Sequence, residues 1–324
     1  MTPSLVFTID TEPDDQWAPL RPDGSLPPFT FANTRGLRPL IEFFRSRGLP
    51  ATWMVSYSVA RDRESAALLR EASWEGDEIA GHLHGWETPP FARFDLGSRP
   101  FIAEYEEPLR LAKHRALQAA HEDAFSARPV SYRAGRWGVD EIELDHIAKL
   151  GYTIDSSIPP GIDFRDRAGL VTRGPDFRGE MSVAPGPRRV GPLWQVPVSI
   201  VPIGPLAAAT GLARMAARRD GRSAPARALC RALAATGLQE VIWIRPLKHE
   251  RAKLVRATRA LLQRGAPIVN VMFHSSEAFA GTSPLSRRQQ DVEQLYRDLD
   301  AIIGAGRAHG ALGRTLREAV AASA

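Results

Sequence analysis

Apolar residues occur along this 324-residue chain in short runs that alternate with longer stretches of helical period. Short runs rich in β-branched residues predict buried strands, and apolar positions repeating every three or four residues predict amphipathic helices. Strands are predicted at residues 5–9, 50–55, 78–84, 131–135, 152–156, 194–198, 241–244 and 268–274. Helices are predicted at residues 34–47, 65–75, 102–125, 139–150, 206–235, 247–264, 286–303 and 313–322. This alternation favours an α/β fold with a mostly parallel sheet or barrel and helices outside it.

Capping and turn residues predict where one helix begins and ends, and the composition of residues 159–192 predicts a long segment without a regular alternation of strands and helices. Thr34 is expected to cap the helix at 34–47, and Gly48 to stop it. Residues 159–192 are rich in Gly, Pro, Asp and Arg without a clear period, so we expect a long excursion with short strands that reshapes the site. Insertions are therefore expected between about residues 159 and 250. Because neither an internal repeat nor a persuasive linker is present, we expect a single domain over residues 1–324.

Composition excludes several classes of protein. The apolar content of 44% and the charged content of 24% are ordinary for a globular protein. No uninterrupted apolar run of about 18 residues occurs, so no membrane span is expected. The chain enters its first strand without the features of a signal peptide, which predicts a cytoplasmic location. The single Cys230 excludes an internal disulfide framework and a cysteine-rich zinc site.

The positive charge is concentrated in one part of the chain. Between Arg214 and Arg264, many arginines and lysines face only three acids, Asp220, Glu240 and Glu250. This block is either a solvated helical face or a surface that meets the phosphates of a lipid-linked sugar, a nucleotide or an anionic membrane. The arginine-rich helix predicted at 206–235 also carries an apolar stripe, which is either core packing or a peripheral membrane contact. The stripe consists of Leu206, Leu212 and Met215. Nucleic acid is not an expected partner, because no recognised nucleic-acid module accompanies the charge.

Four predicted strands end on polar residues that are able to do chemistry. These residues are Asp10 with Glu12, His82 with His84, Arg133, and His274. The carboxyl ends of parallel strands carry the sites of α/β folds. Residues two apart on an extended strand share one face, so the two acids share a face and so do the two histidines.

Two histidines and one carboxylate, from Asp10 or Glu12, would form a metal site with positions left open for water and substrate. This ligand set suits catalytic Zn²⁺, with Fe²⁺, Mn²⁺, Co²⁺ or Ni²⁺ as other occupants. The remaining carboxylate would then be a general base and His274 a general acid.

Five segments, in this order, resemble motifs of the NodB-homology polysaccharide deacetylases, also known as carbohydrate esterase family four. They are residues 8–12 (TIDTE), 78–84 (EIAGHLH), 132–138 (YRAGRWG), 152–157 (YTIDSS) and 271–277 (VMFHSSE). The resemblance covers roughly residues 4–160 and 265–320. It implies a distorted (β/α) barrel, usually of seven strands, that removes N- or O-acetyl groups from sugars with a divalent metal.

The resemblance also implies roles for individual residues. Asp10 would be the catalytic base, held by Arg133 in a charge-assisted pair. His274 would protonate the leaving amine, with Asp155 as its support. His82 matches the first histidine ligand of the family.

Two departures from the family pattern affect the remaining metal ligands. The first motif usually has adjacent acids, whereas here Thr11 intervenes and Glu12 becomes the expected ligand. The second motif usually spaces its histidines four apart, but Trp86 stands four after His82, so His84 must substitute. The run at residues 82–90, together with His-Ser-Ser-Glu at 274–277, resembles a branch of the family linked to surface-polysaccharide gene products.

Further side chains allow two interpretations each. Trp86 and Trp137 either stack on a sugar ring or pack in the protein. Arg136 binds an anionic group of the substrate or pairs with a surface acid. Glu277 is expected to support a loop rather than catalysis, and Asp14 and Asp15 are expected in a turn.

The leading hypothesis is a metal-dependent amidohydrolase that deacetylates an N-acetylated sugar, nucleotide-linked or lipid-linked, during surface polysaccharide or glycoconjugate assembly. The alternative is a catalytically silent carbohydrate-binding or scaffold protein on the same barrel. The altered histidine spacing favours the alternative. The presence of Asp10, Arg133 and His274 together argues against it, because a binding module needs neither a base nor an acid.

Overall fold

The computed structural model describes residues 2–14, 16, 18–167, 169–209, 211 and 224–323. Leu212, Met215, Asp15 and the basic residues from Arg214 to Arg222 lie outside the described residues, so the predictions made for them are not tested. Among the described residues, no helix is both long enough and apolar enough to cross a membrane.

The main sheet is built from parallel strands in a crossover order. Its neighbours are, in spatial order, β10 (Ile268–His274), β1 (Ser4–Thr11), β2 (Thr52–Val55), β3 (Glu78–Leu83), β4 (Ser131–Ala134), β5 (Ile154–Asp155) and β7 (Leu193–Gln195). These seven strands of the described chain run parallel to one another, as βα alternation requires. The edge strand β6 (Arg188–Val190) is antiparallel to β7, and β11 (Leu312–Gly313) pairs with β1.

The sheet curls until its two ends meet. After β7 the chain runs on to Ser199, whose N–H donates to the carbonyl of Asn270 on β10 at 2.9 Å. The N–H of Asn270 donates in return to Ser199 Oγ at 2.9 Å. A separate antiparallel pair, β8 (Ile200–Ile203) and β9 (Glu240–Trp243), follows directly. The predicted distorted (β/α) barrel of seven strands is therefore confirmed, and β7 corresponds to the strand predicted at residues 194–198.

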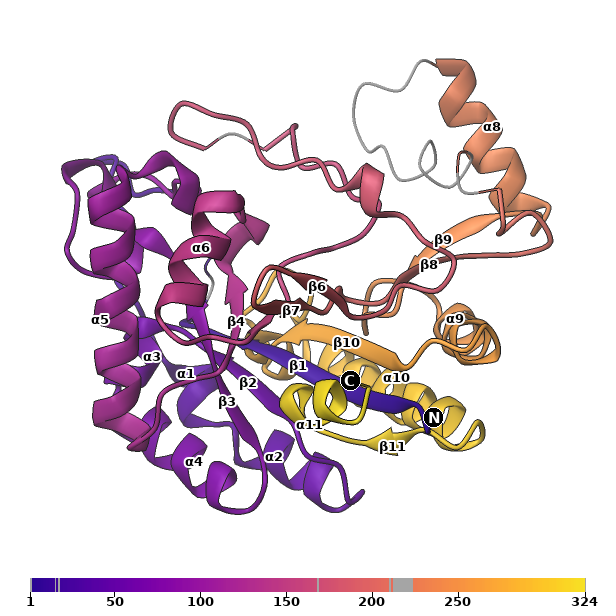
Figure 1. Ribbon diagram of the computed structural model, residues 1–324, viewed down its shortest axis with the longest axis horizontal. Helices are drawn as coiled ribbons and strands as arrows, with labels where there is room; N and C mark the ends of the chain where they lie inside the picture. The colour runs from indigo at the N-terminus through magenta and orange to yellow at the C-terminus, as the bar shows by residue number, and fades with distance from the viewer. Residues whose placement is uncertain are drawn as a thin grey trace.

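Helices surround the sheet (Figure 1). They are α1 (Ala32–Arg35), α2 (Arg38–Arg45), α3 (Tyr57–Arg61), α4 (Arg63–Trp74), α5 (Glu107–Phe125), α6 (Glu141–Lys149), α8 (Ala224–Ala235), α9 (Arg251–Gln263), α10 (Gln289–Arg307) and α11 (Leu316–Ala321). Short 3-10 turns include η1 (Gly85–Glu87), η2 (Arg93–Leu96), η3 (Ile102–Glu104), η4 (Gly135–Trp137), η5 (Arg178–Glu180) and η6 (Ser275–Ala278). In Figure 1, α2 to α5 cover one side of the sheet and α9 and α10 another, while α8 extends away from it.

The predicted helix at 34–47 is in fact two helices, and Thr34 does not cap it. Thr34 lies inside α1, where its Oγ accepts a hydrogen bond from Ser65 Oγ at 2.8 Å. The break falls at Gly36, where a Cβ would come within 2.6 Å of the Phe279 ring. Helix α2 then restarts with a proline in its first turn, a favoured position for proline. Gly48 does end the segment, with φ of 62°.

Strand β1 shows how the barrel interior is layered. Leu5, Phe7 and Ile9 pack outward against the helices, in a large cluster of buried apolar residues. Val6 points to the other face, where it packs with Met54 and Ala80. Because side chains alternate along a strand, Thr8 and Asp10 follow Val6 into the interior. Along β1 the interior of the barrel is therefore apolar at Val6 and polar from Thr8 onward, and Asp10 lies nearest the carboxyl end of the strand.

Candidate active site

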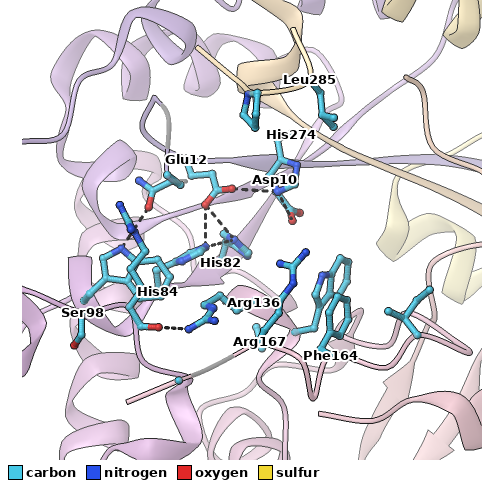
Figure 2. A pocket seen from close by; sticks show the side chains of 18 of the residues that line it. Asp10, Glu12, His82, His84, Ser98, Arg136, Phe164, Arg167, His274 and Leu285 are labelled. Carbon is cyan, nitrogen blue, oxygen red and sulfur yellow. Dashed lines mark hydrogen bonds and ion pairs between the residues drawn. The ribbon is translucent and has the colours of Figure 1, made fainter. Parts of the chain in front are cut away.

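The predicted site residues come together at the carboxyl ends of the strands. A cavity of about 680 Å³ opens there (Figure 2). Eight of the predicted residues line it: Asp10, Glu12, His82, His84, Trp86, Arg136, Trp137 and His274. The other two, Arg133 and Asp155, are fully buried in the barrel interior. Strands far apart in the sequence meet here because β10 and β1 are neighbours, with Asp10 in register with His274.

Glu12, His82 and His84 form a group that could hold a metal ion. One ligand atom from each residue lies within 4.8 Å of the others, and all three side chains are buried. Glu12 Oε2 is 2.8 Å from His84 Nε2 and 3.9 Å from His82 Nε2. The two Nε2 atoms lie 2.9 Å apart. The structure therefore brings together the three ligands expected from the sequence, including His84 at the unusual spacing.

Hydrogen bonding orients His82 for coordination. His82 Nδ1 lies 2.9 Å from the carbonyl oxygen of Arg133. A carbonyl can only accept, so Nδ1 carries the proton and the lone pair of Nε2 faces Glu12 and His84. A second hydrogen bond of this kind is what fixes the tautomer of histidines that bind metals in proteins. Two imidazoles and one carboxylate fit a catalytic divalent cation.

The protonation of the ligand group is set by burial and by its mutual charges. Burial lowers the pKa of His82 to about 4, so this imidazole is neutral at pH 7. Burial alone would raise the pKa of Glu12, but the charge and hydrogen bond of His84, with His274 and His82, lower it to about 2. For His84 the attraction of Glu12 outweighs burial, and its pKa is raised. The group thus contains an ionised carboxylate and a neutral imidazole, the forms in which these side chains bind metals.

Asp10 is held from below by Arg133. Nη1 of Arg133 donates to Asp10 Oδ1 at 2.6 Å, and Nη2 donates to Thr8 Oγ at 2.7 Å. Nε of Arg133 donates to the carbonyl of Ser156 at 2.9 Å. The guanidinium therefore has a fixed orientation, and it holds one carboxylate oxygen while the other, Oδ2, faces His274 at 3.9 Å. This is the arrangement expected of a base and its positioning arginine.

His274 is supported by Glu277, not by Asp155 as the resemblance implied. Glu277 Oε1 lies 2.9 Å from His274 Nδ1, and Arg245 pairs with the same carboxylate oxygen. Because η6 follows His274 directly, the side chain three residues on turns back to reach it. His274 Nε2 is then directed to Glu12 Oε1, 3.3 Å away. Glu277 thus contacts the predicted acid directly, in addition to its place in the turn η6.

Asp155 belongs to a different network. Its carboxylate accepts hydrogen bonds from Ser157 and, at 2.9 Å, from Gln195 Nε2 on β7. Burial, only partly offset by these hydrogen bonds, raises the pKa of Asp155 to about 6. Asp155 therefore links β5 to β7 and helps to complete the barrel.

The aromatic side chains and Arg136 form the walls of the cavity. The Trp86 ring packs edge-on against His84, with 4.3 Å between ring centroids, and its Nε1 donates to Gln16 at 3.3 Å. Trp137 packs against Trp243 on β9 at 5.8 Å. Arg136 donates to the carbonyl of Arg99 and lies 4.0 Å above the Phe101 ring. Each side chain thus both packs in the protein and lines the cavity.

Several lining residues were not expected from the sequence. They are Gln16, Arg99, Phe164, Arg167 and Trp243, among others, whereas Arg245 and Lys248 belong to the basic block noted in the sequence. Most come from loops or from the excursion after residue 159, where no hydrophobic period indicates which way a side chain points. The high content of arginine in these loops was the one available signal.

No family model and no curated protein matches this chain. Solved structures do match. The chain is similar to structures from carbohydrate esterase family four. A Mycobacterium smegmatis protein assigned to the polysaccharide deacetylases has 18% identity and a TM-score of 0.48, over 97% of this chain and 93% of that one.

Two further structures extend the comparison. A family 4 carbohydrate esterase from Streptomyces lividans, in complex with acetate, has 11% identity and a TM-score of 0.45, over 96% of this chain and 91% of that one. A family pseudoenzyme from Bacillus anthracis has 8% identity and a TM-score of 0.45, over 98% of this chain and 65% of that one. At these identities and TM-scores, the function of this chain has to be argued from the geometry of its own site.

Proposed function

We propose that this chain is a metal-dependent hydrolase that removes an N-acetyl or other short acyl group from a sugar. The proposal rests mainly on one observation, the placing of a base and an acid next to a ligand group. Asp10, paired with Arg133, lies 3.9 Å from His274, which is paired with Glu277. His274 lies in turn 3.3 Å from Glu12, which faces His82 and His84. A carbohydrate-binding surface needs none of these pairs.

Glu12, His82 and His84 would hold the metal, with Zn²⁺ the first choice and Fe²⁺, Mn²⁺, Co²⁺ and Ni²⁺ as alternatives. When bound, such an ion lowers the pKa of water and polarises a carbonyl oxygen. The residues of the chain supply the proton transfers. Asp10 accepts a proton from the attacking water through the oxygen that Arg133 leaves open.

His274 completes the reaction at the leaving group. It donates a proton from Nε2 to the sugar nitrogen as the C–N bond breaks, which yields a free amino sugar and acetate. Glu277 stabilises the imidazolium through Nδ1 and fixes the orientation of the ring. Trp86 and Trp137 present aromatic surface to a sugar in a cavity of about 680 Å³, a volume that suits a ligand larger than one monosaccharide.

The biological setting is also part of the proposal. The motif resemblance supports a role in the biosynthesis of a surface polysaccharide or glycoconjugate, with a nucleotide-linked or lipid-linked sugar as substrate in the cytoplasm. Cell fractionation and the loss of a surface glycan on deletion of the gene would test this setting.

The activity itself is tested with the purified protein by metal analysis and by acetate release from N-acetylated sugars. We expect one divalent ion per chain and metal-dependent release of acetate. Asp10→Asn should retain the ion and lose turnover, whereas His82→Ala should lose both. Full activity of Asp10→Asn would contradict the assignment of the base.

A second candidate is a protein that binds carbohydrate without turnover. The spacing of two between His82 and His84 favours it, since the family resemblance implies a spacing of four. It predicts sugar binding with neither stoichiometric metal nor acetate release, so the same two measurements separate the candidates.

A further inference from the structure

Two histidines of the cavity, His84 and His274, are each followed by a glutamate three residues later. The segments are residues 84–87 (HGWE) and 274–277 (HSSE). Among the eight histidines of the chain, only these two have a glutamate at this spacing. Figure 2 shows Glu12 joined to both histidines, by contacts of 2.8 Å to His84 Nε2 and 3.3 Å to His274 Nε2. The same sequence pattern therefore occurs at two of the histidines that face the proposed ligand Glu12.

The chain also folds in the same way at both places. His84 directly follows β3, His274 is the last residue of β10, and a 3-10 turn, η1 or η6, begins at the next residue. Both histidines have extended backbone, with φ and ψ of −108° and 120° at His84 and −101° and 147° at His274. The turn carries the glutamate into the protein interior, where Glu87 and Glu277 are both buried. The combination of strand, histidine and turn thus occurs twice in the site.

The two turns differ in one hydrogen bond. Glu277 Oε1 lies 2.9 Å from His274 Nδ1. At the other turn, His84 Nδ1 and Glu87 Oε1 are both buried, and neither has a hydrogen-bond partner within the described part of the chain. The second oxygen of Glu87 accepts from Ser58 Oγ at 3.4 Å. Since buried polar atoms are almost always paired in proteins, a ring nitrogen and a carboxylate oxygen left over in one turn require an explanation.

Packing and backbone hydrogen bonds hold the His84 ring in place. The Trp86 ring packs edge-on against it. At Gly135, a Cβ would come within 2.8 Å of His84 Cδ2, so the ring fits because this residue has no side chain. Thr88 Oγ donates to the His84 carbonyl at 2.8 Å, and the N–H of Glu87 donates to the same carbonyl at 3.3 Å. Ring and turn are therefore both fixed, and Nδ1 is the ring nitrogen left without a partner.

The charges of Glu87 and His84 act on each other. Burial raises the pKa of Glu87 to about 7, and the charge of His84 is the largest of the effects that oppose this rise. The charge of Glu87 is in turn among the effects that raise the pKa of His84 against burial. The two side chains are therefore near each other in space as well as in sequence.

A metal ion at His84 Nε2 would define the state of the other ring nitrogen. Nε2 must then present its lone pair, so Nδ1 carries the proton and needs an acceptor. We propose that Glu87 accepts this hydrogen bond and is the positioning residue of His84; the inference rests on the proposed function for the metal. A carboxylate in this place fixes the tautomer of a histidine ligand and raises its basicity. Glu87 is thus what allows a histidine only two residues after His82 to serve as a ligand.

Zinc affinity tests the inference without any measurement of turnover. The full chain is titrated with Zn²⁺ in competition with a chromophoric chelator, as wild type, Glu87→Met and Glu78→Gln. Glu87→Met removes both acceptor oxygens and should weaken zinc binding by about 10- to 100-fold. Glu78→Gln, which changes a buried carboxylate at the first residue of β3, is the matched control and should bind zinc as wild type does.

The stability of the metal-free protein separates positioning from packing. Glu87→Met replaces a carboxylate that has an unpaired oxygen by an apolar side chain of similar length, so it should not lower the urea midpoint of the metal-free protein. A fall in both the urea midpoint and the zinc affinity would assign Glu87 to packing and overturn the inference. Equal zinc affinity of wild type and Glu87→Met also overturns it and leaves the hydrolase proposal intact.

A crystal structure of the zinc-loaded wild type gives a result even if Glu87→Met does not fold. We expect Glu87 Oε1 within about 3.2 Å of His84 Nδ1. A separation above about 3.5 Å overturns the inference alone. A wild type that binds no stoichiometric zinc overturns the proposed metal site itself, and the inference with it.

Discussion

Arg133 on β4 donates a hydrogen bond to Asp10 on β1 across the barrel interior, at 2.6 Å, and neither residue is more than 3% exposed. The two strands are separated by β2 and β3 in the sheet, so the pair spans the curl of the barrel. Arg133 therefore fixes the orientation of the proposed base and also neutralises a carboxylate that is buried.

Arg133→Met should remove both effects. We expect turnover to fall by about 100-fold or more, and the free energy of unfolding to fall by about 3–5 kcal/mol because Asp10 is left as an unpaired buried charge. Turnover is measured by acetate release, and stability by urea denaturation. The double variant Asp10→Asn/Arg133→Met should recover most of the stability without the activity. If the double variant were as unstable as Arg133→Met, the loss would be one of packing, not of charge pairing.

Glu277→Gln should affect catalysis more than binding. The substitution removes the charge that supports His274 and leaves its shape nearly unchanged, so we expect kcat to fall about 10- to 100-fold with KM and metal content unchanged. Steady-state kinetics and metal analysis check this. Glu318→Gln, on α11 near the C-terminus, serves as a control of equal charge change. An unchanged kcat would remove Glu277 from the mechanism.

Lys113 links helix α5 to the loop that follows the proposed ligand His84. Its buried Nζ donates to the carbonyls of Gly85, Thr88 and Pro90, at 2.8, 2.8 and 2.7 Å, in the loop that directly follows His84. Lys113→Met should leave these carbonyls unsatisfied and lower the free energy of unfolding by about 3 kcal/mol. It should also weaken metal affinity, measured by competition with a chelator, because His84 loses its anchored neighbour. A destabilised variant with unchanged metal affinity would show that the loop is held by other contacts.

The burial of His121 should make the free energy of unfolding depend on pH. This residue of α5 is fully buried, its Nε2 bonds the carbonyl of Val55 at 3.0 Å, and burial lowers its pKa to about 4. Between pH 6.5 and about 4, the unfolded chain binds a proton at this residue and the folded chain does not. Stability is therefore lost as the pH falls through this window, by about 2 kcal/mol between pH 7.5 and 5.

The measurement is the free energy of unfolding in urea at both pH values. His121→Gln keeps an amide donor for Val55 and should reduce the loss on acidification by about that amount. His309→Gln, a half-buried histidine after α10, is the matched control. Equal losses for wild type and His121→Gln would contradict the assignment.

The strand ends and the ligand set were accessible from the sequence because they depend on short-range rules. A buried strand fixes which of its residues share a face, so Asp10 with Glu12 and His82 with His84 could be paired before any fold was known. Parallel order then brought the strand ends together. Even the unusual position of His84 follows from this alternation, since residues 82 and 84 point the same way.

The features of the site and fold that the sequence did not indicate depend on contacts between loops or on a turn after a strand. Glu277 reaches His274 only because η6 reverses the chain within three residues. Glu104 joins the loop of Arg167 to the segment of Arg99 through backbone N–H donors, and no pattern in either loop indicates that contact. Thr34 carried a typical capping residue type, yet the Phe279 ring at Gly36 placed the helix break elsewhere.

The order of the strands has a consequence for how this protein can change. The three proposed ligands occur within the first 84 residues, on β1 and β3 and just beyond their ends, with β2 between them. Three of the four arginines among the described lining of the cavity, and the support for the proposed acid, come from residues after 135. The proposed metal ligands and most of the charged side chains that line the cavity wall thus lie in different parts of the chain. Exchanging the excursion after residue 159 should therefore redirect the protein to another substrate while the proposed ligand set remains as it is.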